Sequence, residues 1–216
     1  MNIEQSRFNM VEQQIRPWDV LNQDVLGLLF IVKREQFVPP AHRALAFSDL
    51  EIPLPEGEHM FAPKMEARIV QELTLQGHET VLEIGTGSGY LAALLAYQAQ
   101  QVTSYEIKPA LQTLAQQNLA RAGINNINVI AGDGLLSQDE TQYDAIVLSG
   151  SLPAVPEQLL QRLRVGGRLF AFIGTAPVLS AQLTTRVSAE KFETRKLFET
   201  CVKPLVGAEK YSQFKF

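Results

Sequence analysis

The sequence predicts an α/β fold with a doubly wound, mostly parallel seven-stranded sheet, an antiparallel edge strand and an N-terminal helical lobe. Three observations favour this fold. From Val81 onward, short apolar runs alternate with amphipathic helical runs, which is the pattern of a parallel sheet with helices on both faces. The first apolar run leads directly into a glycine-rich turn, as in folds that bind ligands at the carboxyl ends of their strands. Two strand-like runs near the C-terminus flank a turn near Ala189-Glu190, which predicts a hairpin at one edge.

The composition bounds the kind of protein. With 216 residues, of which 46% are hydrophobic and 19% charged, the chain suits one compact domain with a small appended lobe. We expect the helical and extended lobe at residues 1–76 and the ligand-binding core at residues 77–216. A net charge of −4 and a pI near 5.5 argue against nucleic acid or an anionic membrane as a partner. The single Cys201 and an N-terminus without a signal-peptide layout predict a reducing, cytoplasmic location.

The N-terminal lobe is expected to contain helices joined by extended segments. A helix over residues 4–16 should stop at Arg16, because a following proline disfavours helix at the residue before it. Asn22 or Asp24 is expected to cap a second helix over residues 25–33. The other expected segments are a short one at 42–47, an extended proline-rich covering segment at 52–57, and a helix over 64–75 that Gly77 ends.

The core is expected to alternate strands and helices. The expected strands begin at Val81 and then cover 101–107, 127–131, 143–150, 168–173, 182–188 and 194–205. The expected helices cover 91–99, 109–123 and 156–163. Hydrophobic periodicity assigns these segments, and glycines and prolines mark several of their ends. Ligands of such sheets bind beyond the carboxyl ends of the strands, so the residues there are the informative ones.

The turn after the first strand indicates the kind of ligand. A dinucleotide fingerprint, G-x-G-x-x-G, would place its last glycine where this chain has Tyr90, and Glu83 would repel a pyrophosphate. A cationic ligand without phosphates fits better, and S-adenosylmethionine, with its sulfonium and ammonium groups, is such a ligand. Glycines let a ligand approach the backbone where a Cβ would collide. The residues of the turn expected to hold this cofactor are Gly85, Thr86, Gly87, Ser88 and Gly89.

Acidic residues follow three successive strands. Glu83 closes the first strand, Glu106 closes the second, and Asp133 follows the third, directly before Gly134. A carboxylate at the end of the second strand suits a ribose diol, because it can accept two hydroxyl hydrogen bonds. Asp133 is placed to accept a hydrogen bond from an adenine amino group. All four residues are therefore expected to contribute to the cofactor site.

Several segments resemble known methyltransferases in order and spacing. The pattern E-x-G-x-G-x-G at residues 83–89 resembles motif I of the class I, Rossmann-like methyltransferases. The segments that together resemble the protein-L-isoaspartate O-methyltransferases are 10–15, 37–39, 46–49, 81–90, 132–134, 155–157 and 166–169. This resemblance covers nearly the whole chain, including an N-terminal lobe peculiar to that family. It implies methyl transfer from S-adenosylmethionine to the carboxylate of isoaspartyl residues in damaged proteins, which initiates their repair.

The substrate segment departs from the family's pattern. The family has a segment similar to G-Q-T-I-S-Q-P, whereas residues 57–63 of this chain read G-E-H-M-F-A-P. Phe61 stands where the resemblance implies a serine that contacts the substrate, and an aromatic ring cannot donate a hydrogen bond to a carboxylate. His59, Ser149 and Ser151 are the polar candidates that remain to orient the acceptor. For a hydroxyl or amine acceptor, His59 could instead be a general base.

Alternative functions remain open from the sequence. The chain is either an isoaspartyl methyltransferase or a paralogue with the same cofactor and an unidentified small acceptor. A non-catalytic protein that keeps the cofactor pocket as a sensor or scaffold is a third hypothesis, motivated by Phe61. A nicotinamide-dependent oxidoreductase shares the topology, but Tyr90 and Glu83 argue against it. No metal is expected, because no His/Cys cluster has metal-ligand spacing.

Overall fold

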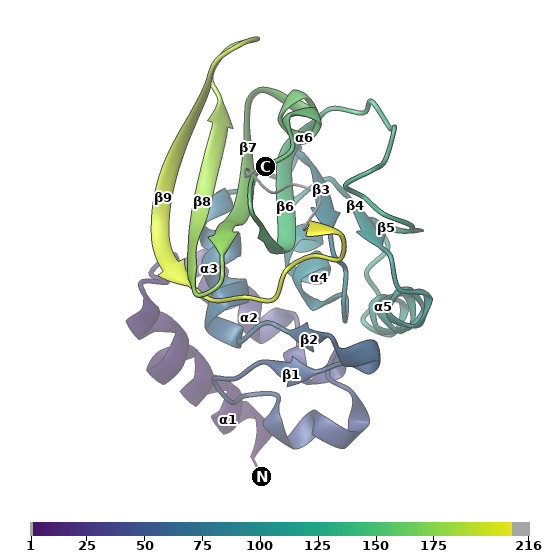
Figure 1. Ribbon diagram of the computed structural model, residues 1–216. Helices are drawn as coiled ribbons and strands as arrows, with labels where there is room; N and C mark the ends of the chain where they lie inside the picture. Colours follow the sequence, from purple (N-terminus) through teal and green to yellow (C-terminus); the bar gives the residue numbers. More distant parts are fainter. Residues whose placement is uncertain (1, 209–216) are drawn as a thin grey trace.

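The computed structural model describes residues 2–208, and its main sheet has seven strands in the order β5-β4-β3-β6-β7-β8-β9 (Figure 1). These strands are β3 (Thr80–Ile84), β4 (Gln101–Glu106), β5 (Ile127–Ala131), β6 (Tyr143–Leu152), β7 (Leu163–Thr175), β8 (Val178–Arg186) and β9 (Phe192–Thr200). The pairs from β5 to β7 are parallel, and the pairs β7/β8 and β8/β9 are antiparallel. The predicted mostly parallel sheet with antiparallel pairing at one edge is confirmed. A separate two-stranded sheet joins β1 (Ile52–Pro53) to β2 (His59–Met60).

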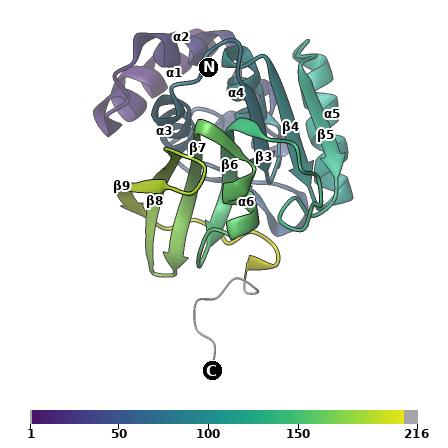
Figure 2. The ribbon, with the colours of Figure 1, turned by 90° about the horizontal axis from the view of Figure 1, so that it is seen from above.

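The helices cover the two faces of the sheet unequally. They are α1 (Ile3–Met10), α2 (Gln23–Ile31), α3 (Pro63–Leu73), α4 (Tyr90–Gln98), α5 (Pro109–Arg121) and α6 (Glu157–Gln161). Helices α1 to α5 bury side chains in one large cluster, which also receives the N-terminal segments. Helix α6 lies on the other face of the sheet (Figure 2). Its Leu159 belongs to a second buried cluster, together with Leu135, Tyr143 and Ala208. No helix connects β5 to β6, so irregular chain covers part of this second face.

The N-terminal part confirms Asn22 as the cap of α2 and corrects three predicted helix ends, the first being that of α2, which ends at Ile31 rather than at residue 33. Asn22 caps α2 by accepting the backbone N–H groups of Asp24 and Val25 at 2.9 and 3.3 Å. The first helical run does not stop at Arg16: a π-helical turn and a 3₁₀ turn continue it to Trp18. Proline fits there because it occupies the first turn of the 3₁₀ segment, where its missing N–H is not needed. Helix α3 ends at Leu73, because Thr74 takes a left-handed conformation with φ 47°.

The strands β7 to β9 differ from their expected positions. Strand β7 begins at Leu163, before the two glycines expected to open it, and β8 begins at Val178. The expected hairpin near residues 189–190 joins β8 to β9. Strand β9 ends at Thr200 rather than at Leu205. The chain then leaves the antiparallel edge and returns across the carboxyl ends of the parallel strands (Figure 1), where Ser151 exchanges backbone hydrogen bonds with Lys203 and Leu205.

The lobe and the core share one apolar interior. Met10, Val11 and Leu29 from the lobe and Val81 and Leu94 from the core belong to the same buried cluster. The division at residue 76 stays a prediction. In Figure 1 the segments with α1, β1 and β2 lie below the carboxyl ends of the parallel strands, so the lobe covers the edge of the sheet where ligands of such folds bind.

Candidate functional site

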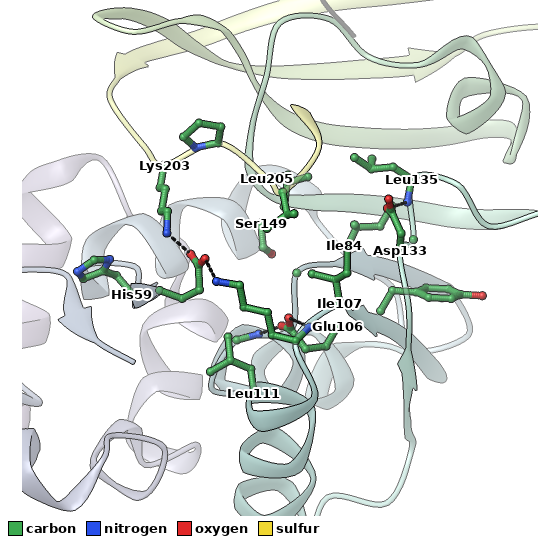
Figure 3. A pocket seen from close by; sticks show the side chains of 18 of the residues that line it. His59, Ile84, Glu106, Ile107, Leu111, Asp133, Leu135, Ser149, Lys203 and Leu205 are labelled. Carbon is green, nitrogen blue, oxygen red and sulfur yellow. Dashed lines mark hydrogen bonds and ion pairs between the residues drawn. The ribbon is translucent and has the colours of Figure 1, made fainter. Parts of the chain in front are cut away.

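A pocket opens at the carboxyl ends of the parallel strands, between the core and the lobe. Its empty space amounts to about 820 Å³, including the part open to solvent. Residues after β3, β4, β5 and β9 line it together with Glu51, Glu58, His59 and Phe61 from the lobe (Figure 3). The core and the lobe therefore contribute to a single pocket.

The glycine-rich turn forms one wall of this pocket. Gly85 and Gly87 line the pocket with φ values of +100° and +55°, which favour glycine because a Cβ would collide with the backbone. The N–H of Gly87 donates to the carboxylate of Glu106 at 2.8 Å. A Cβ on Gly85 would lie 3.3 Å from the Leu205 side chain and from Ser149 Cβ. Close approach of the C-terminal segment and of β6 to the turn thus depends on Gly85.

The other three predicted residues of the turn, Thr86, Ser88 and Gly89, do not line the pocket and instead stabilise the turn by packing and hydrogen bonds. Thr86 and Ser88 are buried, and the Thr86 hydroxyl lies 2.6 Å from that of Ser104. Ser88 Oγ accepts the N–H of Tyr90 at 3.3 Å. A Cβ on Gly89 would lie 3.3 Å from Ala115 in α5, so this glycine permits close packing of the helix. Thr86, Ser88 and Gly89 were expected to help hold the cofactor, but none of them lines the pocket.

Glu106 and Asp133 both line the pocket. Glu106 accepts backbone N–H groups on its two oxygens, from Gly87 at 2.8 Å and from Lys108 at 3.0 Å. Asp133 Oδ1 accepts the N–H of Leu135 at 3.0 Å. Each carboxylate oxygen has a second acceptor site, so both side chains can also accept hydrogen bonds from a ligand. These two acceptors fit the hydroxyl groups of a ribose and the amino group of an adenine.

Gly134 lets the Asp133 turn lie close to the sheet. A Cβ at this position would stand 2.8 Å from Tyr105 Cβ and 3.0 Å from Ile84 Cγ1, closer than side chains pack. Any other residue would therefore push Asp133 away from the ends of β3 and β4. The glycine acts through the position of its neighbour.

Glu83 lies beneath the pocket and is fully buried. Ser104 donates a hydrogen bond to its carboxyl group at 2.5 Å, and Ser149 donates one at 3.3 Å. Burial raises the pKa of Glu83 to about 8, although the two serine hydrogen bonds act in the opposite direction. Glu83 does not line the pocket, so the structure places it as a support for Ser149 and the turn.

The pocket brings together three of the four predicted acceptor residues. His59, Phe61 and Ser149 line the pocket. Ser151 does not: it is buried, and its hydroxyl donates to the carbonyl of Val202 at 3.1 Å. Ser151 thus holds the returning C-terminal segment against β6 and has no free hydroxyl to offer a substrate.

A buried charge network fixes the backbone of Phe61. Arg34 is buried and forms an ion pair with Glu66 in α3. Its guanidinium also donates to the carbonyls of Ala46 at 3.0 Å and Phe61 at 2.6 Å. The ring of Phe61 contacts that of Phe172 edge to face, with 5.6 Å between centroids. Both the main chain and the ring of Phe61 are thereby held in place.

The sequence did not predict the charged cluster at the pocket's mouth. Glu58 pairs with Lys108 at 2.5 Å and with Lys203 at 2.9 Å. Burial alone would raise the pKa of Glu58, but hydrogen bonds and charges from the two lysines lower it below its ordinary value. The sequence did contain one sign that the strand predicted over residues 194–205 ends early. Pro204 has no N–H to donate to a neighbouring strand, which argues against a regular strand at that residue.

The described residues contain neither a metal-binding cluster nor a membrane-spanning helix. Within residues 2–208, no three His, Cys, Asp or Glu side chains gather where they could hold a metal ion. In the same part of the chain, no helix combines the length and the apolar character needed to cross a membrane.

Comparisons with known proteins agree on one family. A family model described as protein-L-isoaspartate(D-aspartate) O-methyltransferase matches residues 5–210. The chain is 40% identical over 203 residues to a protein-L-isoaspartate O-methyltransferase from Methanoculleus marisnigri, covering 93% of this chain and 91% of that protein. It is 39% identical over 202 residues to protein-L-isoaspartate O-methyltransferase 2 from Marinobacter nauticus, covering 93% and 92%.

Solved structures share the fold at lower sequence identity. A Plasmodium falciparum structure described as a protein-L-isoaspartate O-methyltransferase in complex with S-adenosyl-L-homocysteine has a TM-score of 0.79 and 20% identity. The match covers 91% of this chain and 96% of that one. This likeness supports the class I, Rossmann-like fold predicted from the sequence.

Proposed function

The chain belongs to the protein-L-isoaspartate(D-aspartate) O-methyltransferase family, and we propose that it transfers the methyl group of S-adenosylmethionine to the carboxylate of isoaspartyl residues. The acceptor would be a peptide or protein damaged at an aspartyl or asparaginyl position, and methylation would initiate its repair. The proposed place of action is the cytoplasm, where the exposed Cys201 would stay reduced.

One observation carries this proposal. The pocket is lined jointly by Gly85, Gly87, Glu106 and Asp133 of the core and by Glu58, His59 and Phe61 of the lobe. The family model matches both parts in a single span. A protein that only kept the fold would not need the substrate segment to meet the cofactor end of the sheet in one pocket.

We propose that the core residues bind the cofactor. Glu106 would accept hydrogen bonds from the ribose hydroxyls, and Asp133 would accept one from the adenine amino group. The turn of Gly85 and Gly87 would let the ligand approach the backbone. When bound, S-adenosylmethionine supplies an electrophilic methyl group on a sulfonium. The carboxylates that line the pocket suit that positive charge.

The acceptor side requires orientation rather than proton transfer. A carboxylic acid with an ordinary pKa near about 4 is already ionised at neutral pH, so its methylation needs no general base. The residues here would align the carboxylate and exclude water. Phe61 is placed to exclude water with its ring. His59 and the lysines at the mouth offer hydrogen-bond donors, whereas the hydroxyl of Ser149 would first have to leave Glu83.

Transfer of a labelled methyl group to an isoaspartyl peptide tests the proposal. The parent protein should methylate the peptide. The variant Phe61→Ser with Ala62→Gln should raise turnover without changing the affinity for S-adenosylhomocysteine, because one preorganised donor contributes about 10² to 10³ in rate. If both proteins bind S-adenosylhomocysteine and neither methylates the peptide, the proposal fails in favour of another acceptor or a non-catalytic role.

A further inference from the structure

Three charged residues from distant parts of the chain meet at the mouth of the pocket. Glu58 comes from the lobe, Lys108 follows β4, and Lys203 lies in the segment after β9. The two ammonium groups bind opposite oxygens of the Glu58 carboxylate at 2.5 and 2.9 Å, as the dashed lines in Figure 3 show. We refer to these residues as the Glu58 cluster.

The Glu58 cluster carries an excess positive charge. It contains two ammonium groups and one carboxylate, and in the described part of the chain neither lysine forms an ion pair with any other acid. The remaining contacts of the lysines are with neutral backbone carbonyls, Lys108 with Glu56 at 2.9 Å and Lys203 with Gly57 at 3.0 Å. Within the cluster one positive charge is left to attract an anion, although Glu51, Glu106 and Asp133 line the rest of the pocket.

Lys203 is the more available of the two lysines. Its side chain is 49% exposed, compared with 20% for Lys108. Lys108 is also adjacent to the cofactor wall, since its backbone N–H binds Glu106. Figure 3 shows Lys203 on the side of His59, across the pocket from Asp133. Lys203 therefore faces the acceptor side rather than the cofactor side.

The other acceptor-side groups offer few donors to a carboxylate. Phe61 has none, and the hydroxyl of Ser149 already donates to Glu83, so His59 and the lysines are the donors that remain on this side. Glu51 also lines the pocket and would repel a second carboxylate. A lysine that binds an incoming carboxylate would balance this repulsion, and charge-assisted hydrogen bonds are roughly twice as strong as neutral ones.

We propose that Lys203 binds the carboxylate of the methyl acceptor, exchanging its contact with Glu58 for one with the substrate. This inference rests on the proposed function, because it assigns a cationic partner to the same acceptor. In this chain the ammonium group provides the orientation that the Phe61 ring, which has no donor, cannot provide. Before the acceptor binds, the ion pair with Glu58 holds Lys203 in place.

Equilibrium binding of matched peptides tests the inference without requiring turnover. Two fluorescent peptides of the same sequence would carry either the isoaspartyl carboxylate or the corresponding carboxamide. Each would be titrated with the full chain saturated with S-adenosylhomocysteine. The proteins are the parent, Lys203→Met, Lys203→Arg and Glu58→Gln. Lys191→Met is the control, because Lys191 is an exposed lysine that does not line the pocket.

The expected result is a selective loss in one variant. The parent should bind the carboxylate peptide about tenfold or more tightly than the carboxamide, the scale of a hydrogen bond to a charged group. Lys203→Met should abolish this preference, while Lys203→Arg, Lys191→Met and Glu58→Gln keep it. Because Glu58→Gln breaks the same ion pair as Lys203→Met, opposite outcomes for these two variants separate substrate binding from a structural role.

Three results would overturn the inference. They are a parent without carboxylate preference, a Lys203→Met protein that keeps it, and an equal loss in Glu58→Gln, which would show that the cluster only holds the segments together. If Lys203→Met does not fold, a lack of preference in Lys203→Gln decides the question in the same way. A parent that prefers the carboxylate but transfers no methyl group would contradict the proposed function and leave the inference intact.

Discussion

The amide N–H of Gly87 donates to the carboxylate of Glu106 at 2.8 Å, joining the turn after β3 to the end of β4. This contact brings together the two features that the sequence singled out for a cofactor, a glycine-rich turn and an acidic strand end. Because Glu106 uses each oxygen for one backbone N–H, the carboxylate is held in one orientation with acceptor sites left for a ligand. The turn and the acid therefore form one preorganised wall.

Gly87→Val should abolish binding of S-adenosylhomocysteine. Gly87 has φ +55°, a conformation that is a genuine outlier for a β-branched residue, so the turn would move and its N–H would leave Glu106. Calorimetry with S-adenosylhomocysteine measures the loss. Gly77→Val is the matched control, because a Cβ there meets no atom within 4 Å, and it should bind as the parent does. Undiminished binding by Gly87→Val would show that the turn does not contact the ligand.

Asp133→Ala should weaken binding of S-adenosylhomocysteine by about 1–3 kcal/mol, the scale of leaving a buried donor without its acceptor. The side chain also accepts the N–H of Leu135, so part of the loss could come from the loop. Asp133→Asn keeps an oxygen for that N–H and separates the two effects. Equal affinity in Asp133→Ala and the parent would remove Asp133 from the cofactor site.

Arg34→Met should lower the free energy of unfolding by about 3–5 kcal/mol, because it leaves the buried Glu66 without its partner. It should also lower turnover, since Arg34 holds the carbonyl of Phe61. Urea unfolding measures the stability term. Lys191→Met, which breaks an exposed pair with Glu193, should change the free energy of unfolding by less than about 1 kcal/mol. Similar losses in the two variants would mean that Arg34 has no special role.

Glu83 should make the protein less stable as the pH rises. Its pKa is raised to about 8 in the folded state by burial, compared with about 4.3 for an unperturbed glutamate. The unfolded chain therefore loses its proton first, so the stabilisation is complete below about pH 4.3 and is lost progressively up to about pH 8. Glu83→Gln should lose this contribution to the pH dependence. Parallel stability profiles for parent and variant between these pH values would contradict the assignment.

The sequence predicted the parts of the site that depend on local pattern. Glu106 and Asp133 follow apolar strands, and the ends of neighbouring parallel strands lie side by side, so their convergence follows from the alternation of strands and helices. Residue type alone limited the cap of α2 to Asn22 or Asp24, and the structure shows that it is Asn22. The turn residues Gly85 and Gly87 needed only the rule that glycine tolerates positive φ.

Long-range contacts limited the remaining predictions. Ser151 and Ser149 stand two residues apart in β6, but only the return of the C-terminal segment decides that the Ser151 hydroxyl binds Val202. The hydrophobic pattern predicts a strand over residues 194–205, which includes Lys203. Its ion pair with Glu58 joins positions far apart in the chain. Such pairing between distant segments has no local sequence signal.

The comparison of one peptide in two isomeric forms tests the central claim most directly. The parent protein, a labelled methyl donor and a peptide containing either isoaspartate or aspartate at the same position would be incubated, and base-labile methyl ester counted. We predict ester on the isoaspartyl peptide, little on the aspartyl peptide, and none on either with Gly87→Val. Equal labelling of the two peptides, or none on the isoaspartyl peptide at saturating cofactor, would contradict isoaspartyl methyl transfer by this chain.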